Sequence, residues 1–182
     1  MPILPDERDP RLITLRRGGT LTDDHHRLLA EWAITCADHV LQLFEAQQPA
    51  DSRPRDALDV ARAWIRGDAP MRVAHQAAFT ANAAAKNVPD AARFAALSAG
   101  QAVAVAHVAA HDLGAAAYAI RAAGAAASAN ATDNDDNNDL DAARARVRER
   151  DWQRAQLPTA VRDLVLDDQQ RRNAICWNAF ND

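Results

Sequence analysis

The residues best suited to chemistry are His107 and His111, which stand four positions apart in a run of small apolar residues. On a helix, this spacing places two imidazoles on one face, where both can reach a single metal ion. Asp112 and Tyr118 belong to the same run and add a carboxylate and a phenol. Small residues at helical spacing on the same face would let a second helix approach closely. The polar side chains would then lie in an interior seam, where they need partners.

Three readings of this seam stay open. It could bind a metal ion, it could line a pocket for a ligand or a partner, or its histidines could be purely structural. The run HVAAH lacks the glutamate of the zinc-protease motif HExxH, which excludes that class of metalloprotease. Further metal ligands would have to come from other segments, and the candidates are Asp112, His75, Cys36 and His39. No cofactor is predicted, because the chain carries no phosphate loop, dinucleotide fingerprint or nucleophile elbow.

A second group of candidates lies in the segment RPRDALDVARAWIRG. Arg53 and Arg55 flank a proline at the expected start of a helix. There they can hold carboxylates of the preceding helix or of an acidic partner, and pairing within the chain is the default. Arg62 and Trp64 are residue types that dominate the energetics of protein interfaces. The segment is therefore the predicted contact surface for a protein partner.

Composition sets the fold class. The 182 residues fit one domain, and their richness in alanine with only six glycines favours helix throughout. The net charge of −4, with both signs mixed along the chain, gives no general attraction to nucleic acid or to an anionic membrane. No stretch approaches the roughly 20 strongly apolar residues that a bilayer requires. Without a signal peptide or a disulfide framework, a cytoplasmic location is expected.

Proline, glycine and capping residues divide the chain into segments. We expect an extended leader over residues 1–20, helices over 22–46, 54–66, 70–86 and 90–123, an Asn/Asp-rich acidic loop insertion over 124–139, and further helices over 140–156 and 159–180. The helix over 90–123 is long, so a kink or break is expected near residues 111–114. Asparagine and aspartate favour turns, so the insertion is predicted to be dispensable for folding. Together the segments predict a single-domain, all-α multi-helix bundle around residues 101–121.

Four segments, taken in order, resemble a bacterial immunity-protein family, the immunity-five-like group. They are residues 16–45, 53–67, 100–123 and 152–180, so the resemblance covers most of 16–180 apart from the acidic insertion. It implies an all-α protein that neutralises a toxin of an interbacterial conflict system. It brings no catalytic residues, but the family's motif segments contain Arg53, Arg55, His107, His111 and Tyr118.

Two functional classes follow. In the first, the chain is a binding module that blocks a protein toxin and catalyses nothing, which is the reading we favour. In the second, the seam of His107 and His111 is the small-molecule or metal site of a helical enzyme. Arginine and aromatic side chains clustered on a surface would favour the first class, whereas polar groups converging in a pocket would favour the second. The sequence also allows a homodimer.

Overall fold

The computed structural model describes residues 4–181 except 6 and 131–134. The described residues form seven α-helices and three short 3₁₀ turns, and none of them forms a strand, which confirms the predicted all-α multi-helix bundle. The elements are η1 (Pro10–Leu12), η2 (Leu15–Arg17), α1 (Asp23–Glu45), α2 (Arg53–Arg66), α3 (Met71–Ala84), α4 (Asp90–Ala104), η3 (Ala109–His111), α5 (Asp112–Asn130), α6 (Asp135–Ala155) and α7 (Thr159–Arg172). None of the described helices combines the length and the apolarity needed to cross a membrane.

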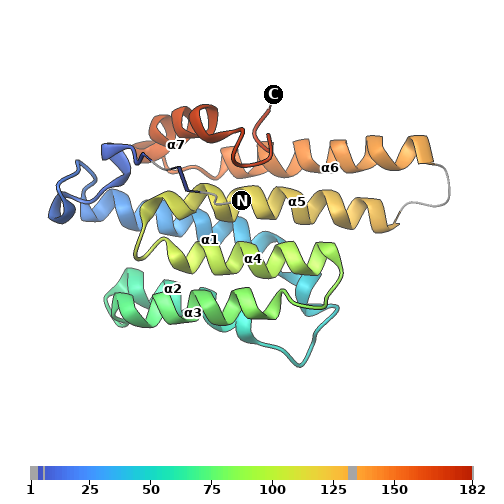
Figure 1. The fold of residues 1–182 in the computed structure, drawn as a ribbon, viewed down its shortest axis with the longest axis horizontal. Helices are drawn as coiled ribbons and strands as arrows, with labels where there is room; N and C mark the ends of the chain where they lie inside the picture. The colour runs from blue at the N-terminus through green and yellow to red at the C-terminus, as the bar shows by residue number, and fades with distance from the viewer. Residues whose placement is uncertain (1–3, 6, 131–134, 182) are drawn as a thin grey trace.

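Helices α4 and α5 form a hairpin in the middle of the bundle, and α1 packs across both (Figure 1). Helix α3 flanks α4 on one side, with α2 beside it, and α6 flanks α5 on the other. Helix α7 lies over the end of the bundle where the N-terminal leader also packs (Figure 1). The α4–α5 hairpin is therefore the centre of the molecule, as the sequence predicted for residues 101–121.

Helix boundaries follow capping residues in α1 and α2. The Thr22 hydroxyl accepts a hydrogen bond from the His25 N–H, so it caps α1 as predicted, and two aspartates occupy the first turn. Helix α2 ends at Gly67, which adopts a left-handed φ of 85°. Glycine enters that conformation without the steric penalty that a β-carbon brings.

Because the side chains between them are mostly alanine, the two helices of the central hairpin pack closely together. The buried face of α5 is almost entirely alanine, and the Ser98 hydroxyl of α4 donates to the Ala115 carbonyl across the hairpin at 2.8 Å. Glycine is needed where polar side chains cross the neighbouring backbone. A β-carbon at Gly100 would lie 2.2 Å from Asn82 Oδ1, and one at Gly114 would lie 2.6 Å from Gln101 Oε1.

The segment predicted as helical over 90–123 is interrupted, but the predicted position of the kink or break is wrong. Helix α4 ends at Ala104, and the chain reverses through residues 105–111 before α5 begins, so a complete break comes earlier than residues 111–114. Side chains from far away in the sequence bind carbonyls of this turn. The His26 ring bonds to the Val105 carbonyl at 2.7 Å, and Arg17 donates to the His107 carbonyl at 3.1 Å. Such tertiary capping leaves no local signal.

The leader is compact where the sequence predicted an extended segment. Residues 10–12 and 15–17 form 3₁₀ turns, and Thr14 and Leu21 are joined by an isolated bridge. The Asp9 side chain caps the first turn by accepting from the Arg11 N–H. Leu12 and Leu21 are buried in the core, and this packing draws the leader onto the bundle.

The acidic loop insertion predicted over 124–139 is wrong in its described part. Residues 124–130 belong to α5 and residues 135–139 to α6, while 131–134 lie outside the described residues. Asparagine and aspartate are weak helix formers, but they do not exclude a helix. Helix α6 runs beside α5 (Figure 1), and Arg146 lies against Gly124 while Ala142 and Ala145 are buried. Whether the segment is dispensable stays a prediction.

Candidate functional site

His107 and His111 lie close together, although no single helix carries them. His107 belongs to the turn after α4, His111 ends η3, and His75 of α3 completes a row of three imidazoles that we call the histidine corner. The ring centroids are 4.7 Å apart between His75 and His107 and 5.1 Å apart between His107 and His111. His75 is exposed and the other two are half-buried, as predicted for His107 and His111. The chain reversal, rather than a common helix face, brings the predicted pair together.

The two half-buried rings differ in their hydrogen bonds. His111 Nδ1 lies 2.7 Å from Gln101 Oε1, which can only accept, so this nitrogen carries the proton. His107 Nδ1 is buried without a hydrogen-bond partner. Burial, reinforced by neighbouring positive charge, lowers the pKa of His107 to about 4 and that of His111 to about 3. Both rings are therefore neutral at pH 7.

Among the described residues, no cluster of three or more His, Cys, Asp or Glu side chains has the arrangement to hold a metal ion. In the histidine corner, the His75 and His107 rings meet edge to face, with planes 84° apart, whereas the planes of His107 and His111 are 48° apart. The other ligand candidates lie elsewhere. Cys36 is fully buried, which raises the pKa of its thiol, and His39 bonds to Glu149 at 2.8 Å while stacking on Trp152.

Asp112 is fully buried on the other side of the turn, in an ionic network with α7. The Arg172 guanidinium binds Asp168, lies 3.4 Å from Asp112 Oδ1 and donates to the Ala110 carbonyl at 2.8 Å. Burial raises the pKa of Asp112 to about 7, against the attraction of Arg172. This network fixes α7 to the start of α5 and is closed to solvent. Its sequence signal, an Asp–Arg pair four residues apart in α7, is too common to single out.

Tyr118 is half-buried and far from the histidine corner along α5. Its ring lies 5.0 Å from the Trp177 ring and 6.2 Å from the Phe94 ring, centroid to centroid. Burial raises the pKa of its phenol. Tyr118 therefore belongs to a separate aromatic cluster, and the single seam predicted from the sequence is divided between two places.

The arginines of α2 are paired within the chain, as the sequence led us to expect. Arg53 binds Asp51 at 2.5 Å, and Arg55 binds Glu45 of α1 at 2.8 Å. Arg62 bonds to Asp59 at 2.8 Å and reaches Asp38 of α1 at 3.2 Å. The pairs of Arg55 and Arg62 with α1 link the two helices at the surface, and all of these ion pairs reduce the capacity of α2 to engage a partner.

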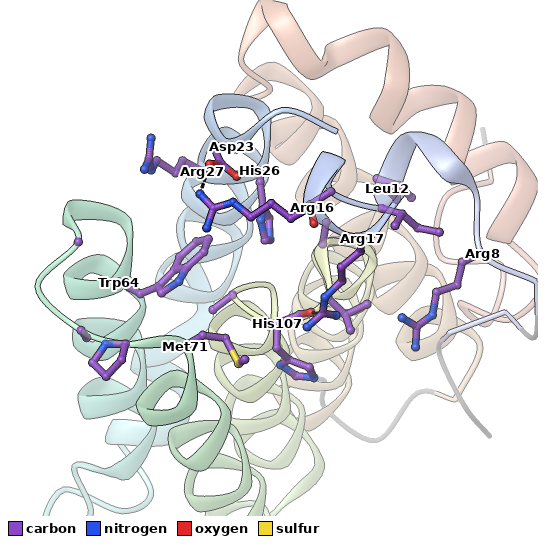
Figure 2. Close-up of a pocket in the computed structure, with 18 residues that line it drawn as sticks. Arg8, Leu12, Arg16, Arg17, Asp23, His26, Arg27, Trp64, Met71 and His107 are labelled. Atoms are coloured by element: carbon purple, nitrogen blue, oxygen red, sulfur yellow. Dashed lines mark hydrogen bonds and ion pairs between the residues drawn. The ribbon is translucent and has the colours of Figure 1, made fainter. Parts of the chain in front are cut away.

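Trp64 and His107 line a common cavity of about 360 Å³ between the leader, α2, the start of α3 and the α4–α5 turn (Figure 2). We call it the leader cleft. The Trp64 ring packs edge to face against His26 at a centroid distance of 5.0 Å. The cleft is also lined by Arg8, Arg16 and Arg17 of the leader and by Met71 of α3.

Positive charge dominates the leader cleft, although the chain as a whole is acidic. Arg16 extends across the cleft to pair with Asp23 at 2.6 Å, and Arg17 is held by the His107 carbonyl (Figure 2). Arg8 makes no ion pair with the described residues. Asp23 is the one carboxylate in the described lining, so the cleft presents excess positive charge to an incoming group.

An exposed apolar stripe continues from the leader cleft along α3. Met71, His75 and Phe79 lie four residues apart and so share one face of the helix. Phe79 is 58% exposed and packs its ring edge to face on His75, 5.0 Å away, which in turn contacts His107. The sequence pointed to His75 only as a candidate metal ligand and did not single out Phe79. The cleft and stripe together form one surface, which we call the cleft–stripe face.

Comparison with known proteins gives one match. A family model described as Imm-5 like putative immunity protein matches residues 19–160, which spans α1 to α6 and the Trp64 and His107 sides of the cleft. No curated protein and no solved structure matches the chain.

Proposed function

The chain belongs to the family of Imm-5 like putative immunity proteins, and from that premise we propose that it neutralises a protein toxin by binding it directly. The family match over residues 19–160 is the observation that carries this proposal. The described residues support it in a second way, because the predicted polar residues divide between a buried ionic network, a partly buried histidine row, the aromatic cluster of Tyr118 and paired surface arginines. None of these presents a nucleophile beside a base.

The cleft–stripe face is the surface we propose for the toxin. Its exposed side chains are methionine, phenylalanine and arginine, with tryptophan at the rim, and these types are enriched in interface cores and hot spots. Phe79 and Met71 are large exposed apolar side chains on one helix face, in a chain with few aromatics. Arg55 and Arg62 contribute less in this proposal, since both already bind carboxylates of the chain.

The charge of this face indicates what the toxin presents. Excess positive charge in the leader cleft is complemented by an acidic side chain, and such complementarity steers association and fixes register. The overall charge of −4 would instead favour a basic toxin. We give more weight to the charge of the cleft than to the net charge. Charges that meet directly across an interface are close together and are screened little by salt, whereas the net charge acts over longer distances and is screened more.

Co-expression with toxins encoded beside the gene tests the function. The wild-type protein is expected to restore growth and to co-purify with one of them at a fixed ratio. Light scattering on the free protein also tests whether it forms the homodimer that the sequence allows. If no neighbouring toxin is neutralised and none binds the purified protein, the proposal is wrong.

Two matched variants test the surface. Phe79→Asp places a charge in the middle of the stripe, whereas Leu140→Asp makes the same change on α6, where Leu140 is similarly exposed at 53%. Phe79→Asp is expected to abolish protection while the circular-dichroism spectrum and thermal midpoint stay unchanged. Leu140→Asp is expected to protect like the wild type. Equal protection by both variants would move the contact away from the cleft–stripe face.

A further inference from the structure

Arg121 of α5 is held between two aromatic rings on the opposite part of the bundle from the leader cleft. Its guanidinium carbon lies 4.0 Å from the centroid of the Phe94 ring and 4.3 Å from the centroid of the Trp177 ring. Cation–π contacts of this kind fix the guanidinium plane and leave its N–H edge free to donate. The side chain is therefore positioned without a hydrogen bond to any of the residues that the structure describes.

Arg121 lacks the carboxylate partner that a half-buried arginine normally has. It forms no ion pair or hydrogen bond with the described residues, and the nearby Asp90 is engaged by Arg93 at 3.0 Å. Burial also lowers the pKa of Arg121, which shows that the surrounding protein disfavours its charge. Polar groups in such positions usually have a partner, so an anion supplied from outside the chain would stabilise this one.

A cavity of about 760 Å³ adjoins Arg121 between α5, α6 and the C-terminal turn, a volume in the range of small-molecule sites. Arg146 of α6 lines the same cavity and forms no ion pair with the described residues. The Asn178 and Asn181 side chains add amide groups. The charges of Asp90 and Arg93 offset each other, so Arg121 and Arg146 give the cavity excess positive charge.

The backbone that supports this arrangement is strained. Trp177 and Asn178 adopt left-handed φ angles of 58° and 55°, a conformation that is uncommon for a bulky residue. Hydrogen bonds from the Asn178 and Phe180 N–H groups to Asn173 hold the turn closed. Strain of this kind is concentrated at functional sites, and here it accompanies the placement of the indole over Arg121.

We propose that this cavity binds a small ligand through an oxyanion, a phosphate or a carboxylate, held by the N–H edge of Arg121 with Arg146 as a second cation. Arginine suits this task because its planar fork matches two oxygens of either group at once. The site is separate from the cleft–stripe face and requires no toxin. Loss of one function leaves the other in place, so the two proposals are tested independently.

Calorimetric titration of the wild-type protein with inorganic phosphate, and separately with glutarate, distinguishes the two oxyanions. One of them is expected to bind with a Kd of about 1 mM or tighter, while chloride at matched ionic strength does not. Tryptophan fluorescence is expected to change on binding and to lose that change in Trp177→Phe, which removes the indole beside Arg121. Absence of binding by either oxyanion up to about 20 mM would overturn the proposal.

Arginine variants locate the binding. Arg121→Lys keeps the charge but loses the stacked fork, and is expected to weaken binding at least about tenfold. Arg66→Lys is the matched control, since Arg66 is exposed and paired with Asp68, and it is expected to bind like the wild type. If Arg121→Lys does not fold, the Arg146→Gln variant tests the site instead, because Arg146 is exposed. This variant is expected to bind the oxyanion more weakly than the wild type. Unchanged affinity in the folded variants would place the oxyanion elsewhere and reject the site.

Discussion

At the scale of single residues, the histidine corner combines two rings with opposite hydrogen-bonding states. His111 donates to Gln101, whereas the buried His107 Nδ1 has no partner. An unsatisfied buried polar atom costs free energy, and proteins accept such costs at functional positions. His107 therefore suits a position that awaits a partner, while His111 suits a structural position.

Two leucine variants separate these roles. His107→Leu removes an unsatisfied nitrogen and is expected to leave the free energy of unfolding unchanged within about 0.5 kcal/mol, or to raise it. His111→Leu leaves Gln101 Oε1 without its donor and is expected to cost about 1–3 kcal/mol. Urea denaturation of both variants measures the difference. Equal losses would mean that His107 is as structural as its neighbour.

Acid should destabilise the fold through the same rings. The pKa values of about 4 for His107 and 3 for His111 lie below the value near 6.5 expected in the unfolded chain. Between about pH 6.5 and 4 the unfolded state binds more protons, so stability falls as the pH is lowered through this window. Asp112, whose pKa is raised from 3.8 to about 7, acts in the opposite direction throughout this window, but it is one group against two.

The His107→Gln/His111→Gln double variant isolates the histidine contribution. Its stability is expected to depend less on pH, by a slope equivalent to about one to two protons near pH 5. Parallel stability profiles for the double variant and the wild type would show that these rings titrate normally.

The sequence alone identified the two histidines and their partial burial. It could not assign their hydrogen bonds, because Gln101 reaches His111 only across the chain reversal.

At the scale of elements, α7 is anchored to the α4–α5 turn by buried charge. Arg172→Met would leave Asp112 and Asp168 without their cation and is expected to cost about 3–5 kcal/mol. Arg171→Met is the matched control, because Arg171 pairs with Asp167 at the surface and should change stability by less than about 1 kcal/mol. Thermal denaturation of both variants is the measurement. A small loss in Arg172→Met would show that α7 docks mainly by apolar contacts.

The distal ends of α5 and α6 form an arm that projects from the bundle (Figure 1). Because Gly124 faces Arg146, deleting residues 129–141 and inserting a short Gly/Ser linker removes residues 129–130 of α5 and 135–141 of α6 and leaves the two shortened helices ending opposite each other. The thermal midpoint is expected to stay within about 3 °C of the wild type. Replacing residues 124–139 removes residues 124–130 of α5 but only residues 135–139 of α6, and it should cost more, since Arg146 of α6 then loses the part of α5 that it packs against. A large and similar drop in the thermal midpoint of both variants would show that the bundle needs the arm for its stability.

Helix identity was predictable wherever capping and apolar spacing agreed, as for α1 with Thr22 and α2 with Gly67. Prediction failed where a tertiary contact set the outcome. The turn after α4 depends on His26 and Arg17, and the arm depends on α6 packing beside α5. Local propensity carries no record of such partners.

At the scale of the whole molecule, the proposed functions occupy different parts of one bundle. The cleft–stripe face joins the leader to α2, α3 and the α4–α5 turn, and the Arg121 cavity joins α5 to α6 and the C-terminal turn. The sequence singled out Trp64 and His107, which line the first, and Tyr118, which lies beside the second. It did not show that they belong to different sites, because residues 107 and 118 were expected on one helix face.

Closure of the leader cleft depends on contacts between parts of the chain that are far apart in sequence. Arg17 meets His107 across 90 residues, and His26 meets Val105 across 79. Helical hairpins form early because their contacts are local, whereas long loops close late. The cleft should therefore be the last part of the molecule to assemble and the first to open.

In hydrogen–deuterium exchange, the amides of residues 105–111 should lose protection before those of α4 and α5. The Arg17→Ala variant should speed the exchange of these amides without affecting the arm. Uniform exchange across the central hairpin would contradict this.

A toxin bound over the cleft would then hold closed the segment that folds last, so the protein would reach its most rigid form only in the complex.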